Sequence, residues 1–234
     1  MGAIYRREMG AFFTSGIAYV FLAVFYFFSG YFFYNEVLSS GYTDTSPVFQ
    51  NMFKIVLFLI PILTMRLLSE EKKNRTDQGL LTAPVGLGEI VVGKYLAALT
   101  IYIIAESIIF VYAVILGYLG TVAWAALLGN YFAMLLLGAA FIAVGIFISS
   151  LTENQMTAAV FSMAVLFFLY LFGSTAEKVS KKWMYDIIKE LSFYDRYVEF
   201  TQGVFNLTSV LFYLSTAFLF NFFTVRVLEK RRWS

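Results

Sequence analysis

The segment from Gly88 to Lys94 is the first of three sets of residues whose types and spacing suggest chemistry. It fits G-x-x-x-x-G-K, a pattern in which a glycine-rich loop binds nucleotide phosphates. Tyr95 stands where such a loop needs Ser or Thr for magnesium, and no soluble strand precedes the segment. We therefore expect no nucleotide to bind here.

Glu106 is the second feature, a lone carboxyl inside a long apolar stretch. If that stretch crosses a bilayer, an ionised group at its middle costs at least about 2.5 kcal/mol. The group should then be protonated, paired or beside water. Lys54 on another apolar stretch and Tyr102 one turn earlier are the candidate partners. A structural contact between helices, a place in the lining of a pathway and proton coupling all remain open.

The third feature is a charged segment between two apolar stretches, residues 69–86. Glu70 is spaced to face Lys73 and Asn74, and Glu71 to face Arg75, along one helix. An apolar pair and a helix-stopping proline follow. We predict a short polar helix with an apolar corner that docks a soluble partner through Glu70, Glu71, Lys72, Lys73, Thr76, Leu80, Leu81 and Pro84. A solvated loop is the alternative.

Composition narrows the remaining chemistry. Of 234 residues 60% are hydrophobic and only 14% charged, with no Cys and no His. Thiol nucleophiles, imidazole bases, disulfides and the usual soft metal ligands are excluded, and we predict no catalytic residue, metal or cofactor on this chain. A net charge of +2 is too small to indicate nucleic-acid binding. A chain with this much apolar surface is expected to lie in a membrane, in contact with lipid.

Six stretches are long and apolar enough to span a membrane as helices. No charge occurs in the 46 residues between Glu106 and Glu153, which as helix would extend roughly 69 Å. That is about twice the bilayer core, so the chain must turn back, and we place the turn at 117–121. We predict one all-α transmembrane domain over 1–234, with spans at 17–34, 48–68, 88–118, 122–150, 157–173 and 207–227.

Basic residues predict the orientation. With cytoplasmic ends, eleven Lys and Arg fall inside and five outside, all five in the segment 174–206. The loops 35–47 and 117–121 hold neither residue. We therefore predict a multi-pass protein of the plasma membrane with both termini in the cytoplasm. The first apolar run reads as a retained anchor and not as a cleaved signal.

Two segments outside the spans have amphipathic patterns. Residues 1–15 can lie as a helix in the inner headgroup region, or form a plain charged leader. Within residues 175–200, apolar residues recur at every fourth position from 179 to 191 and predict an outer helix, followed by an aromatic piece at 193–200. A solvated loop is the alternative. In the fourth span, small residues favour close helix contact, either within the bundle or at a dimer seam: Gly138, Ala139, Ala140, Ala143 and Gly145.

The central loop and its flanks resemble the permease subunits of ATP-binding cassette (ABC) exporters of the second type, in particular the branch associated with gliding motility. The matching segments are 67–76, 80–85, 90–94, 149–154 and 224–233. In that family the loop is a coupling helix that sits in a groove of the ATPase subunit. Two positions depart from the family pattern: Gly79 replaces a large apolar residue, and Arg75 replaces the common glycine before Thr76.

The resemblance implies a non-catalytic permease subunit of an ATP-driven exporter. ATP and magnesium would bind a separate ATPase subunit, and a second permease copy or a paralogue would complete the pathway. Force transmission to an extracytoplasmic partner, with nothing carried across, is the first alternative. A channel or scaffold without an ATPase is the second. The absence of His, Cys and paired intramembrane carboxylates argues against a membrane-embedded enzyme.

Overall fold

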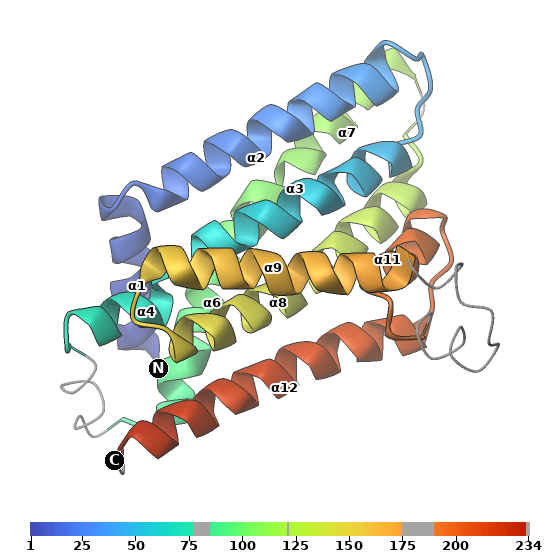
Figure 1. The fold of residues 1–234 in the computed structure, drawn as a ribbon. Helices are drawn as coiled ribbons and strands as arrows, with labels where there is room; N and C mark the ends of the chain where they lie inside the picture. Colours follow the sequence, from blue (N-terminus) through green and yellow to red (C-terminus); the bar gives the residue numbers. More distant parts are fainter. Residues whose placement is uncertain (77–84, 121, 175–189, 233–234) are drawn as a thin grey trace.

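A computed structural model describes residues 1–76, 85–120, 122–174 and 190–232. The described residues are mainly helical and contain no strand. Helices satisfy every backbone polar group internally, as a bilayer requires. Long helices run side by side in one bundle, with short helices at both ends (Figure 1). The elements in chain order are α1 (Gly2–Thr14), α2 (Ile17–Phe33), the π-helical turn η1 (Tyr34–Leu38), α3 (Ser46–Thr64), α4 (Arg66–Lys73), α6 (Leu87–Glu106), α7 (Ile108–Leu119), α8 (Trp124–Leu151), α9 (Gln155–Ser174), α11 (Phe193–Thr201) and α12 (Leu207–Arg232).

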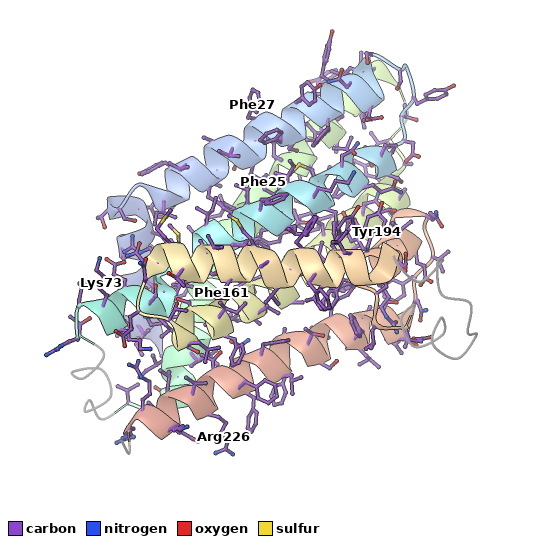
Figure 2. The ribbon with its side chains drawn as sticks, in the orientation of Figure 1. Phe25, Phe27, Lys73, Phe161, Tyr194 and Arg226 are labelled. Carbon is purple, nitrogen blue, oxygen red and sulfur yellow. The ribbon has the colours of Figure 1, made fainter. Side chains whose placement is uncertain are left out.

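Five helical segments among the described residues are long and apolar enough to cross a membrane: 17–38, 46–73, 87–119, 124–151 and 207–232. The expected span at 157–173 corresponds to α9, whose apolar run from Gln155 to Leu171 is shorter than the other five. Large apolar side chains point outward from the bundle, among them Phe27 and Phe161, while Phe25 is buried (Figure 2). Such a surface suits lipid as its solvent.

Two of the expected spans are interrupted. The span predicted at 48–68 divides at Met65: α3 ends at Thr64, three residues after Pro61, and α4 begins at Arg66. The span predicted at 88–118 divides at Ser107, between α6 and α7. Neither break was expected. The turn predicted at 117–121 is confirmed by the end of α7 at Leu119 and the start of α8 at Trp124.

α8 is the central helix of the bundle and the most buried of the five long segments. It packs against α3, α4, α6, α9, α11 and α12. A Cβ at Gly138 would lie 2.2 Å from the ring of Tyr102 in α6, and one at Gly145 would lie 2.2 Å from Oγ1 of Thr64 in α3. The small residues of α8 are buried and make close contacts within this chain, which favours contact within the bundle over a dimer seam at these positions.

The N-terminus, α4 and the C-terminal turn of α12 lie at one end of the bundle, which we call the termini end (Figure 1). α1 turns into α2 at Gly16, whose φ of 78° is the left-handed conformation that glycine adopts readily. α1 packs on α6, where a Cβ at Gly93 would lie 3.0 Å from Cγ2 of Ile4. The amphipathic stretch expected at 1–15 is therefore a helix held against the bundle.

The opposite end, which we call the far end, holds η1, the α7–α8 turn and α11 (Figure 1). The aromatic piece expected at 193–200 is α11, and Tyr197 donates a hydrogen bond to the carbonyl of Phe49 at 2.9 Å. Arg196 pairs with Glu190, donates to Ser209 and lies 4.7 Å from the ring centre of Phe212. The outer helix expected at 175–191 falls almost entirely outside the described residues.

Candidate docking site and buried polar groups

α4 is fixed to the core of the bundle by one hydroxyl of α8. Ser149 Oγ accepts hydrogen bonds from the backbone N–H groups of Leu68 (3.2 Å) and Ser69 (3.1 Å), and donates to the carbonyl of Met65 (2.9 Å). The first N–H groups of a helix have no partner within it, so this hydroxyl caps α4 from outside. The break at Met65 is thereby stabilised, and α4 is tied to the central helix.

The C-terminus of α4 is closed by a Schellman motif. The N–H of Thr76 donates to the carbonyl of Glu71 at 3.0 Å, and that of Arg75 donates to the carbonyl of Lys72 at 3.2 Å. Arg75 has a φ of 56°, the left-handed conformation that favours glycine. The departure from the family's glycine noted above therefore coincides with a strained backbone position.

Replacing Arg75 with glycine should stabilise the end of α4. A left-handed conformation costs a residue with a Cβ about 1–2 kcal/mol, and glycine avoids this cost. We expect the purified R75G protein to unfold at a higher temperature than the wild type. The exposed neighbour Asn74, at a φ of −86°, is the control, since Asn74→Gly should not raise the unfolding temperature. Equal or lower stability of R75G would contradict the assigned strain.

A cluster of four charged side chains joins α1, α4 and α6 at the termini end. Lys94 is 1% exposed, and its Nζ lies 2.9 Å from Glu8, 3.0 Å from Glu71 and 2.6 Å from the carbonyl oxygen of Leu67. Arg7 bridges the same two carboxylates, at 2.6 Å from Glu8 and in a shorter contact with Glu71. A buried lysine with three acceptors is fully satisfied, so the cluster holds the three helices together.

The ion pairs of this cluster determine the protonation state of Glu8. Burial raises the pKa of Glu8, but Lys94 and Arg7 together outweigh that effect, and the pKa lies below the ordinary value of a glutamate. Glu8 is therefore ionised at neutral pH and contributes stability there.

Stability should fall in acid as this contribution is lost. A carboxyl with a lowered pKa stabilises the fold above its unfolded value and loses that effect as the pH falls through the folded value. We expect the unfolding temperature of the wild type to drop below about pH 4.3, the ordinary range of glutamate. Glu8→Gln should be less stable at neutral pH and less sensitive to acid in the same thermal scans. Parallel pH profiles would contradict this account.

A cavity of about 190 Å³ opens beside the cluster, between α1 and α4. It is lined by Arg7, Glu8, Arg66, Glu70 and Glu71 among others. Oε2 of Glu71 is buried without a hydrogen-bond partner among the described residues. A donor from water or from a partner protein would satisfy this atom.

α4 is also connected to the last helix. Lys72 Nζ lies 3.4 Å from Glu153 in the α8–α9 turn, and Arg231 of α12 lies 3.9 Å from the same carboxylate. Lys72 also donates to the carbonyl of Leu151 at 3.4 Å. A displacement of α4 would therefore act on α1, α6, α8 and α12 together.

The predicted docking residues divide into inward and outward groups. Glu70 pairs with Arg66 at 3.1 Å, and not with Lys73 or Asn74 as expected. Glu71 points into the cluster and not toward Arg75. Lys73 and Thr76 are exposed, and Lys73 extends from the C-terminal end of α4 (Figure 2). The positions of Leu80, Leu81 and Pro84 lie outside the described residues.

Sequence reasoning missed the role of Lys94. The G-x-x-x-x-G-K segment lies in α6 from Leu87 onward, so its backbone forms a helix and not a phosphate-binding loop. Lys94 instead completes the ion cluster. The available signal was a lysine within an apolar helix, which requires a partner.

The intramembrane candidates do not meet. Glu106 is 2% exposed, and neither of its carboxyl oxygens has a hydrogen-bond partner among the described residues. Lys54 is exposed and lies on the outer side of α3. Tyr102 donates to the carbonyl of Met134 at 2.9 Å. The suggested pairing of Glu106 with Lys54 or Tyr102 is therefore wrong for this conformation.

Apolar helices long enough to cross a bilayer, together with an anchored charged helix at one end, define a multi-pass membrane protein. Residues 3–228 match the family model described as ABC-2 family transporter protein, and the chain belongs to this family. The match covers nearly the whole chain and does not single out one branch of the family. A comparison with curated proteins found no significant match. The chain is thus a membrane component of the ABC transporter type.

Proposed function

We propose that this chain is the permease subunit of an ATP-driven exporter and works as a homodimer with two ATPase subunits. The anchoring of α4 is the observation that carries the proposal. Ser149 fixes its start, Glu71 ties it to Lys94 in α6, and Lys72 links it through Glu153 to α12. A force applied to α4 by an ATPase would reach most of the bundle.

The orientation in this proposal rests on charge. Lys and Arg gather at the termini end, on α1, α4 and the last turns of α12, whereas Arg196 is the basic residue described at the far end. Positive residues favour the cytoplasmic side. We therefore place both termini and α4 in the cytoplasm, α1 in the inner headgroup region and α9 as a sixth span of the plasma membrane, all within a single transmembrane domain.

ATP and magnesium would bind the ATPase subunit, since the pattern at 88–94 is helical here. The exposed Lys73 and Thr76, with Leu80, Leu81 and Pro84 beyond them, form the proposed contact surface. Glu71 takes a different role from the one first expected, as it holds α4 to α1 and α6. Nucleotide-driven closure of the ATPases would then displace α4 and rearrange the helices.

Co-purification with the ATPase tests the docking claim. The combined variant Lys73→Glu, Leu80→Asp and Leu81→Asp should lose the ATPase, because charge is reversed or introduced across the contact surface. Lys230→Glu is the matched control at the same end of the bundle and should keep it. An ATPase retained by the combined variant would contradict docking at this site.

Transmission of force to an extracytoplasmic partner is the alternative that one observation favours. α11 is anchored by Tyr197 to α3 and by Arg196 to the start of α12, so the far end is also rigidly coupled to the bundle. Reconstituted vesicles in which ATP drives no cargo movement, but changes the binding of such a partner, would favour this alternative over export.

A further inference from the structure

A small cavity lies beside Glu106, where α6 ends inside the bundle. Its volume is about 20 Å³, which is enough for one water molecule. Side chains of α2, α3, α7 and α8 form its other walls, and they are apolar except for Ser29. Ser29 Oγ accepts a hydrogen bond from Tyr112 at 2.9 Å. The site thus brings a carboxyl and a hydroxyl together around space for a single water.

Among the described residues, no Lys or Arg side chain lines this cavity to compensate an ionised carboxylate. Among the described residues, the ionisable side chains that interact electrostatically with Glu106 are tyrosines of α6, α8 and α11: Tyr102, Tyr131 and Tyr197. Tyr102 and Tyr197 donate their hydroxyl protons to backbone carbonyls, at 2.9 Å in both cases. An unpaired carboxylate is far more costly in an apolar interior than a neutral acid. The geometry therefore requires the neutral form.

The helix is interrupted at Ser107, directly after Glu106. α6 ends at Glu106 and α7 begins at Ile108. The carbonyl of Ile104 accepts hydrogen bonds from Ser107 Oγ at 2.6 Å and from Tyr26 of α2 at 3.1 Å. These side chains partly replace the helical hydrogen bonding around the break. A change in the angle between α6 and α7 would alter the access of water to Glu106.

We propose that Glu106 is a proton-binding site in the core of the bundle, which holds a proton and one water molecule in this conformation. When movement about Ser107 admits more water, the acid transfers its proton to water, giving a carboxylate and hydronium. Closure of the site reverses the transfer. Proton uptake and release would thus accompany the conformational cycle, whether or not an ATPase docks at α4.

Infrared spectroscopy of the purified protein in lipid nanodiscs at pH 7 tests the proposal without the ATPase. The wild type should show a protonated-carboxyl stretch that shifts in D₂O. Glu106→Gln should lose this band, and Glu89→Gln, which changes an exposed glutamate of the same helix, should keep it. A wild type without the band, or a Glu106→Gln protein that retains it, would overturn the proposal.

Isotope labelling of the wild type assigns the band to a residue type even if Glu106→Gln fails to fold. Carbon-13 in the glutamate side-chain carboxyl should shift the wild-type band, because the group is a glutamic acid. An unshifted band would assign the proton to another residue type and overturn the proposal.

Discussion

Lys94→Met should lower the free energy of unfolding by about 3–5 kcal/mol, the usual effect of removing one member of a buried charge cluster. Methionine has nearly the same length but cannot donate to Glu8, Glu71 or the carbonyl of Leu67, which Lys94 binds at 2.6–3.0 Å. Two carboxylates would then share Arg7 alone. Thermal unfolding of the purified protein in nanodiscs measures the loss as a lower midpoint.

Lys73→Met is the matched control for this prediction, because Lys73 is exposed and has no ion pair among the described residues. Its stability should stay within about 0.5 kcal/mol of the wild type. The double variant Lys94→Met with Glu71→Gln should recover part of the loss, since one uncompensated charge is removed. Equal midpoints for the two single variants would contradict the structural role of the cluster.

Gly138→Ala should also destabilise the protein, by about 1–3 kcal/mol or more, through overpacking. The new Cβ would meet three ring atoms of Tyr102 at 2.2–2.8 Å. The ring cannot move away cheaply, because it is fully buried and its hydroxyl is bound to the carbonyl of Met134. α6 and α8 must separate to admit the methyl group. The midpoint of thermal unfolding is again the measurement.

Gly129→Ala provides the control within the same helix. A Cβ there meets no atom within 4 Å, and alanine favours the helix by up to about 1 kcal/mol over glycine. Gly129→Ala should therefore be as stable as the wild type or slightly more stable. Equal unfolding midpoints for Gly138→Ala and Gly129→Ala would contradict the close approach of α6 and α8 at Gly138.

The positions of five spans could be predicted because a bilayer imposes a length and a polarity on every crossing. The long charge-free stretch after Glu106 had to turn within 117–121, and α7 does end at Leu119. The breaks at Met65 and Ser107 could not be found in this way, because hydrogen bonds from other helices stabilise them. Ser149 caps the first break from a position over 80 residues away, and Tyr26 binds the carbonyl next to the second.

Polar contacts were harder to predict than spans. The depths of Lys54 and Glu106 were compatible with pairing, but depth leaves open which way each helix face points. Lys54 points outward and Glu106 inward. Glu71 had a suitable partner in the nearby Arg75, yet the buried Lys94 of α6 attracts it more strongly than an exposed neighbour would. In both cases the partner of the glutamate depends on packing between distant helices, which the spacing of residues along one helix does not predict.

Site-directed cross-linking tests the central proposal most directly, and the chain has no cysteine of its own to interfere. A photoreactive label on Lys73→Cys, at the exposed end of α4, should form an adduct with the ATPase in membranes that contain both proteins. The same label on Tyr42→Cys, exposed beyond η1 at the far end, should form none. Absence of the ATPase adduct from position 73, or an equal yield from position 42, would contradict the proposal that α4 docks the ATPase.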